Sequence, residues 1–137
     1  MDSKALLAKA LPCVRETGQW IQSAISQVKS GDIIYKGTND LVSFVDQQAE
    51  SKLKDGLSAI FPEAQFIAEE SDSTYDEVGN GYYWVIDPLD GTTNFLHGLP
   101  IYAVSVGLIY NKQPILGMIY EPNQDEMFHA SKGNGAS

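Results

Sequence analysis

The chain has 137 residues, which suits one compact domain and leaves too little length for two. Hydrophobic residues make up 43% of it and charged residues 20%, which is ordinary for a globular protein. The formal net charge of −9 argues against nucleic acid and anionic membranes as partners, because both bind basic surfaces. We expect no membrane-spanning segment and no signal peptide, since no apolar run approaches ~20 residues. The single cysteine, Cys13, cannot form an internal disulfide, which favours a cytoplasmic location and a place in the core.

The first part of the chain has the pattern of two helices. Apolar residues recur every three or four positions over residues 7–28, which predicts an amphipathic helix. Pro12 predicts a kink or a break near the start of this helix. Residues 41–45 suggest an extended segment, and a second helix is expected from Asp46 to the Phe-Pro pair at 61–62.

From Gln65 onward, short apolar runs alternate with turn residues, which predicts strands. The predicted strands cover residues 65–68, 82–86, 102–110, 115–120 and 126–130. Residues 71–81 are polar and contain glycine, which is typical of a surface loop. A helical layer followed by an antiparallel meander belongs to the α+β class, so we expect helices layered on an antiparallel sheet. No closing element is predicted after Ala130, which would leave the last edge of the sheet bare.

The most informative segment is Trp84–Phe95, in which an apolar run leads into two aspartates three residues apart. A proline and a glycine in this segment indicate a turn that brings the carboxylates of Asp87 and Asp90 to one side. Two carboxylates on a rigid turn suit divalent cations, and a helix start at residues 92–94 suits a phosphate. The alternative is a turn aspartate beside an acid at a helix N-terminus, both of which are common.

A metal site beside a phosphate site indicates phosphoryl transfer. The three-residue spacing, with proline after the first acid, disfavours an aspartyl phosphate intermediate and favours attack by metal-activated water. Glu69 and Glu70 follow a predicted strand and could add a third carboxylate, although glutamates before a loop are usually solvated. Asp46 is explained equally well as a helix N-cap, and Lys36 either meets a phosphate or remains in solvent.

Three segments, Asp40–Asp46, Phe66–Ser71 and Asp87–Phe95, together resemble the motifs of one family in its own order. That family is the inositol monophosphatases, which are Mg²⁺-dependent sugar phosphatases. Within these motifs Ala68 replaces a usual glycine, and Ser43 stands where the family element has threonine. The resemblance covers nearly the whole chain but only the front half of a usual member. It implies that residues 1–137 form an N-terminal metal- and phosphate-binding domain and that the C-terminal domain is absent.

The resemblance implies a set of metal ligands. Glu69, Asp87 and the backbone carbonyl of Leu89 would bind a first Mg²⁺ ion. Asp87 and Asp90 would bind a second, so that Asp87 bridges the two ions of a site that holds roughly two or three.

The same resemblance implies the groups that act on the substrate. The backbone N–H groups of Gly91 and Thr92 would bind the phosphate, and Asp90 would contact the sugar. Asp46 and Thr92 would orient and activate the attacking water, with Glu69 holding its metal ion.

The resemblance therefore implies a phosphoric monoester hydrolase that acts on a small sugar or inositol phosphate. We also expect a homodimer, and we expect weak activity unless the C-terminal half is supplied, for example as a separate fragment. The alternative hypothesis is a non-catalytic domain that keeps the phosphatase scaffold and binds a cation or a partner.

Overall fold

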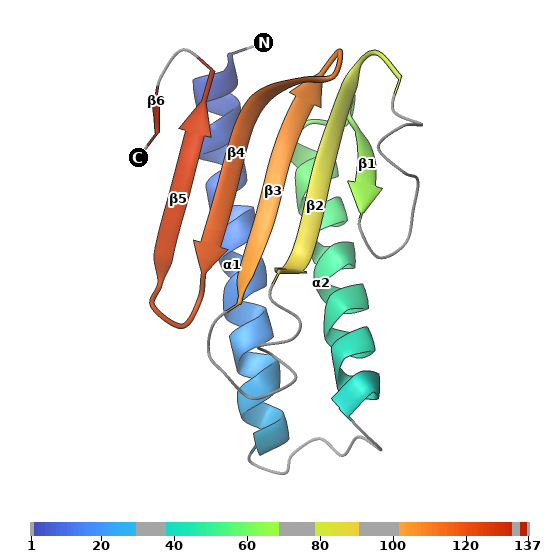
Figure 1. Ribbon diagram of the computed structural model, residues 1–137, viewed down its shortest axis with the longest axis vertical. Coiled ribbons are helices and arrows are strands. Elements are labelled where there is room, and N and C mark those ends of the chain that lie inside the picture. The colour runs from blue at the N-terminus through green and yellow to red at the C-terminus, as the bar shows by residue number, and fades with distance from the viewer. Residues whose placement is uncertain (1, 30–37, 69–78, 91–101, 133–134, 137) are drawn as a thin grey trace.

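A computed structural model describes residues 2–29, 38–68, 79–90, 102–132 and 135–136. In this part of the chain two helices lie against one face of a six-stranded sheet (Figure 1). The helices are α1 (Ser3–Lys29) and α2 (Thr38–Ile60). The strands are β1 (Gln65–Ala68), β2 (Tyr82–Asp90), β3 (Ala103–Tyr110), β4 (Gln113–Glu121), β5 (Glu126–Ser131) and β6 (Gly135–Ala136). This layering confirms the predicted α+β class.

The sheet follows the order of the sequence, from β1 at one edge to β6 at the other. Strands β2 to β6 pair antiparallel with their neighbours, as the meander predicts. The pair β1 and β2 is parallel, so the expectation of a wholly antiparallel sheet is wrong at this edge. Because β1 and β2 run the same way, their carboxyl ends lie at the same end of the sheet.

Helix α1 begins at a side-chain cap and continues through its proline. The Asp2 carboxylate accepts hydrogen bonds from the backbone N–H groups of Lys4 and Ala5, at 3.1 and 3.3 Å. This N-cap satisfies donors that have no partner within the helix. Pro12 lies inside α1, so the alternative of a helix break there is wrong.

Helix α2 begins at Thr38, so the extended segment expected at residues 41–45 is helical instead. The short run of β-branched and aromatic residues favours a strand by local propensity alone. Packing overrides that preference, because Val45 is fully buried and the ring of Phe44 lies 6.2 Å from that of Trp20 on α1. The end of α2 before the Phe-Pro pair agrees with the prediction.

The core lies between the helices and the sheet. It takes alternate residues from the strands and a stripe of residues at helical spacing from α1 and α2. Its largest fully buried members include Trp84, Tyr120, Ile21, Leu53, Leu57, Leu108 and Met118. In the described residues no helix is long and apolar enough to cross a membrane.

The last described element corrects one further expectation. Residues Gly135–Ala136 form β6 and pair with β5, so the segment after Ala130 does contribute a closing strand, although a very short one. A short edge strand exposes few unpaired backbone groups to other chains.

Candidate active site

The acidic segment belongs to a strand rather than to a turn. Strand β2 continues beyond Ile86 as far as Asp90, so the turn that was expected between Asp87 and Asp90 is not formed. Strand β2 is irregular at this point, because its pairing with β3 shifts register between the two aspartates. A proline has no N–H for the ladder and is tolerated in a strand at such an irregularity, which explains Pro88.

The register shift determines which face of the sheet the two aspartates occupy. Asp87 lies opposite Ser105, and Asp90 lies opposite Ala103, so three steps on β2 match two steps on β3. One extra residue on β2 makes this a β-bulge. In a regular strand, residues three apart lie on opposite faces, and the extra residue cancels that alternation. The positions of Asp87 and Asp90 therefore share one face of the sheet. This outcome agrees with the prediction from the sequence, which attributed it to a turn.

The Asp87 side chain is half-buried at the end of β2. Its Oδ1 atom accepts a hydrogen bond of 3.3 Å from the backbone N–H of Leu89. That bond lies within the bulge and ties the carboxylate to its own strand. The Leu89 side chain is 2% exposed and lies in the core, so the role expected for this residue concerns only its backbone.

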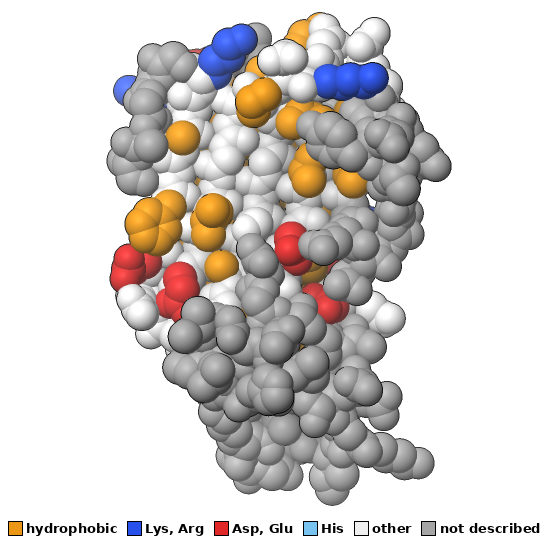
Figure 2. All heavy atoms as spheres, viewed as in Figure 1, with side chains coloured by type: hydrophobic (Ala, Val, Ile, Leu, Met, Phe, Trp, Pro, Cys, Tyr) orange, Lys and Arg blue, Asp and Glu red, His pale blue; other side chains and the backbone are white. Residues whose placement is uncertain are grey.

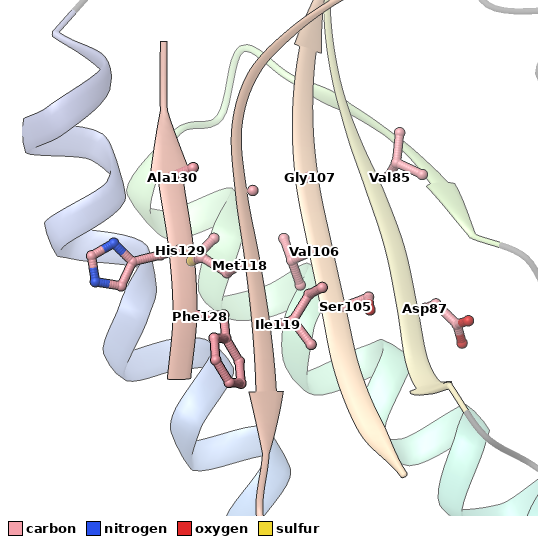
Figure 3. A pocket seen from close by; sticks show the side chains of 11 residues that line it. Val85, Asp87, Ser105, Val106, Gly107, Met118, Ile119, Phe128, His129 and Ala130 are labelled. Atoms are coloured by element: carbon pink, nitrogen blue, oxygen red, sulfur yellow. The ribbon is translucent and has the colours of Figure 1, made fainter. Parts of the chain in front are cut away.

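Asp87 also lies at the margin of a groove of about 700 Å³ on the sheet face away from the helices (Figure 3). Ser105, its partner on β3, lines the same groove. Nothing in the sequence singles out Ser105, because it reads as an ordinary strand residue. The alternation of β3 marks it as facing away from the helices, but only the register places it opposite Asp87.

Asp46 is the most buried described carboxylate of the expected site. Its exposed fraction is 5%, and it lies within α2 well beyond the first turn. The alternative interpretation of Asp46 as an N-cap is therefore wrong, because a cap precedes the first helical residue. Burial of a carboxylate is unfavourable unless other groups compensate it. Asp46 is therefore not an ordinary aspartate on a solvated helix surface.

Several expected site residues lie outside the described residues, namely Glu69, Glu70, Gly91, Thr92, Lys36 and the side chain of Asp90. The structure does describe the strand that leads to Glu69. Strand β1 ends at Ala68, which lies opposite Ile86, the residue before Asp87. The chain therefore leaves β1 at the level where β2 enters its acidic segment.

The donor set of this segment suits a hard divalent cation. It comprises the carboxylate of Asp87, the carbonyl of Leu89 and a second aspartate position on the same face. Mg²⁺ takes oxygen ligands of these kinds, and its site commonly uses only one or two carboxylates. Among the side chains that the structure describes, no three acidic, histidine or cysteine residues gather at one point.

Cys13 lies on α1, and its side chain faces Gly56 on α2. Burial raises the pKa of the Cys13 thiol, and the charge of Glu16 raises it further. A raised pKa keeps the group in the thiol form at neutral pH, whereas a nucleophile requires the thiolate. The structure therefore agrees with a packing role for Cys13.

The fold and this site define an α+β domain with acidic residues on a bulged strand end, beside a layer of two helices. Comparison with known proteins identifies the family. The chain matches the model of the inositol monophosphatase family over residues 2–137. It belongs to the inositol monophosphatase family.

The relatives agree in both sequence and structure. The chain is 40% identical to the fructose-1,6-bisphosphatase/inositol-1-monophosphatase of Aquifex aeolicus, over 87% of this chain and 44% of that protein. It is 40% identical to an inositol monophosphatase of Dictyostelium discoideum, over 95% of this chain and 48% of that protein. The crystal structure of inositol monophosphatase II from Staphylococcus aureus superposes with a TM-score of 0.83 at 32% identity, over 97% of this chain and 48% of that one. The chain thus spans about half the length of the relatives it matches, and it forms the N-terminal portion of their fold.

Proposed function

We propose that this chain carries the metal- and phosphate-binding part of a Mg²⁺-dependent phosphatase that hydrolyses a small phosphate monoester. The observation that supports this most directly is the bulge in β2, which puts the positions of Asp87 and Asp90 on one face. The carboxyl ends of β1 and β2 lie at the same end of the sheet, where Glu69 follows β1 in the sequence.

In this proposal the metal ligands are Glu69, Asp87, the carbonyl of Leu89 and Asp90. Asp87 bridges two metal ions, and the complete centre holds roughly two or three ions. Bound Mg²⁺ would supply charge neutralisation at the phosphate and a water of lowered pKa. The hydrogen bond from Leu89 N–H to Asp87 Oδ1 limits the directions in which this carboxylate can turn, which favours a fixed ligand geometry.

The remaining residues act on the substrate and the water. The N–H groups of Gly91 and Thr92 bind the phosphate, and Asp90 contacts the sugar hydroxyls. Asp46 and Thr92 orient and activate the attacking water, and Glu69 holds its metal ion. The burial of Asp46 supports this role, because a carboxylate held away from bulk solvent has a fixed position from which to contact a water molecule.

The names of the relatives support a substrate class. The Aquifex aeolicus relative is named as both a fructose-1,6-bisphosphatase and an inositol-1-monophosphatase, and the Dictyostelium discoideum relative as an inositol monophosphatase. One structure of the Staphylococcus aureus protein holds inositol monophosphate and another holds 2′-AMP. We infer that this chain acts on an inositol monophosphate or a similar small sugar phosphate. We further propose that it acts in the cytoplasm and as a homodimer. The C-terminal half would be supplied in the same chain or as a separate fragment.

The substitution Asp87→Asn tests the proposal, since it removes one charge and keeps the shape of the side chain. We expect Mg²⁺ binding to weaken by at least ~10-fold and phosphate release by the completed protein to fall by at least ~100-fold. Calorimetric titration with Mg²⁺ and a phosphate-release assay on inositol 1-phosphate measure the two effects.

The matched control is Asp55→Asn, which removes the same charge from an exposed position on α2. This control should leave both measurements unchanged within about twofold. Unchanged turnover in Asp87→Asn would contradict the proposal. A wild-type protein that binds Mg²⁺ or a partner but never releases phosphate would instead support the non-catalytic alternative.

A further inference from the structure

The strand pairing that holds Asp90 in place is short. Beyond the bulge, the described ladder between β2 and β3 contains one further pair, Asp90 opposite Ala103. On its other side, β3 begins to pair with β4 only at Val104, which lies opposite Tyr120. A pair at the end of a ladder opens easily unless another contact holds the strand. The position of Asp90 therefore depends on how firmly the start of β3 is fixed.

Tyr102, the residue before Ala103, joins the start of β3 to the core and to the turn between β4 and β5. Its side chain is 6% exposed and belongs to the core between the helices and the sheet. Its hydroxyl group is hydrogen-bonded to the side chain of Asn123 in the turn. Burial raises the pKa of Tyr102, and the hydrogen bond with Asn123 acts in the opposite direction. That direction is expected when the Asn123 amide donates to the phenol oxygen, because such a bond favours the ionised form.

A carboxylate holds the Asn123 side chain in its orientation. The Asn123 Nδ2 atom also donates to Glu121 Oε1 at 3.2 Å, and Glu121 Oε2 accepts a hydrogen bond from the backbone N–H of Gln124. Hydrogen bonds to a carboxylate are stronger than those between neutral groups. Nδ2 carries two N–H donors, so one serves Glu121 and the other serves Tyr102. The turn therefore presents a fixed donor to the start of β3.

This turn and the acidic segment lie at the same end of the sheet. Strand β2 ends where β3 begins, and β3 begins where β4 ends, because both pairs are antiparallel (Figure 1). Figure 2 shows acidic side chains over the β4–β5 turn, at the lower left of the molecule. A core role alone explains the buried ring of Tyr102 and a partner for its hydroxyl. It does not explain why this anchor directly precedes the residue that pairs with Asp90.

We propose that Tyr102 and Asn123 are positioning residues for Asp90. Their hydrogen bond fixes the start of β3 against the β4–β5 turn, and the pairing of Ala103 then fixes the end of β2. The inference rests on the proposed function, because Asp90 is a metal ligand only in that proposal. Groups that orient metal ligands matter for affinity, and removing a direct one commonly weakens metal binding by ~10–100-fold. Tyr102 acts through the backbone, so its effect should be smaller.

The substitution Tyr102→Phe tests the proposal, because it removes the hydroxyl and keeps the buried ring. Without metal, we expect the backbone amides at the start of β3 to exchange hydrogen at least ~5-fold faster than in the wild type. The dissociation constant for Mg²⁺ should rise by ~3–10-fold. Hydrogen exchange of peptides covering residues 102–108, followed by mass spectrometry, and calorimetric titration with Mg²⁺ measure the two effects.

Tyr83→Phe is the matched control. Tyr83 lies near the opposite end of β2 from Asp90, and its hydroxyl accepts a hydrogen bond of 3.3 Å from the backbone N–H of Gly79. The control thus removes the same atom and one hydrogen bond from another strand tyrosine. Its affinity for Mg²⁺ should stay within about twofold of the wild type. Equal weakening in Tyr83→Phe and Tyr102→Phe would overturn the proposal, since it would indicate a general loss of stability.

A double-mutant cycle tests whether Tyr102 and Asn123 act together. Asn123→Ala should weaken Mg²⁺ binding about as much as Tyr102→Phe does. Added to Tyr102→Phe, it should change the dissociation constant by less than about twofold, because the hydrogen bond is already lost. Fully additive losses would overturn the proposal.

Asp87→Asn separates this inference from the function on which it rests. If Asp87→Asn loses Mg²⁺ binding while Tyr102→Phe binds Mg²⁺ as tightly as the wild type, the positioning role is wrong and the proposed function stands. If Asp87→Asn binds Mg²⁺ as tightly as the wild type, the proposed function is wrong, and the positioning role fails with it.

Discussion

Tyr120 shows how one buried polar atom can make the stability of this fold depend on pH. Its ring is 1% exposed under α1, and its hydroxyl donates a hydrogen bond of 2.6 Å to Asp125 in the turn between β4 and β5. Burial raises the pKa of Tyr120, and the hydrogen bond to Asp125 raises it further. The hydroxyl is therefore held in its neutral form, and the β4–β5 turn is tied to the core.

The sign of the pH dependence follows from this shift. Below the ordinary tyrosine pKa of ~10, both the folded and the unfolded chain keep the Tyr120 proton, and the contribution to stability is complete. Above that pH the unfolded chain ionises first, so the contribution of Tyr120 falls as pH rises toward its folded pKa.

We therefore expect Tyr120→Phe to lose about 1 kcal/mol of unfolding free energy at pH 8, because it removes the hydrogen bond to Asp125. The difference from the wild type should shrink between about pH 10 and 11. Urea titrations across this range measure it. A difference that stays constant to pH 11 would contradict the assignment of the alkaline step to Tyr120.

At the scale of elements, the contact between α1 and β4 depends on one glycine. Gly18 lies on α1 at the ring of Tyr120, and a Cβ atom built there would collide with two ring carbons. The ring is buried and tied to Asp125, so it cannot move aside easily. The absence of a side chain at this position sets how closely the helix approaches the sheet.

Two opposing effects decide the outcome of Gly18→Ala. Alanine favours the helix by about 1 kcal/mol over glycine, whereas overpacking costs about 1–3 kcal/mol. The collision is with a fixed ring, so we expect a net loss of roughly 1–2 kcal/mol in urea unfolding. Ser23→Ala, at an exposed position on the same helix, should be neutral or slightly stabilising. A Gly18→Ala chain as stable as Ser23→Ala would show that the helix can shift away from the sheet.

The elements also show how far sequence reasoning reaches. Most helices and strands could be predicted because the spacing of apolar residues is a local property of the sequence. Leu53 and Leu57 on α2 are buried four residues apart, and Val104 and Val106 on β3 are buried two residues apart. The start of α2 could not be predicted, because the packing of Val45 and Phe44 against distant residues outweighs their local preference for a strand. The parallel pairing of β1 with β2 depends on a connection whose path no local pattern encodes.

At the scale of the whole molecule, the described residues form one helical layer and one sheet. The relatives are about twice as long, and the site proposed at the end of β2 lies in the part of the family fold that this chain matches. A two-metal phosphatase requires all its ligands in place at once, because each missing ligand weakens both metal binding and substrate positioning.

We therefore expect the isolated 137-residue chain to release phosphate at least ~100-fold more slowly than the same chain combined with a complementary C-terminal half. A malachite-green assay with inositol 1-phosphate and Mg²⁺ measures both preparations, and EDTA provides the metal-free baseline. Rapid, EDTA-sensitive turnover by a homogeneous preparation of the chain alone would contradict this expectation.

The sequence by itself determined the candidate chemistry, because the acidic motif from Asp87 to Asp90 and the segments around Asp46 and Glu69 can be read without a fold. It also determined most element positions, since the period of apolar residues reports which side of a helix or strand is buried. Only the tertiary structure decided how the positions of Asp87 and Asp90 come to share a face, and that β1 pairs parallel with β2. The physical reason is that a β-bulge and a parallel strand pair are properties of pairing between distant segments, whereas sequence patterns record only the preferences of neighbouring residues.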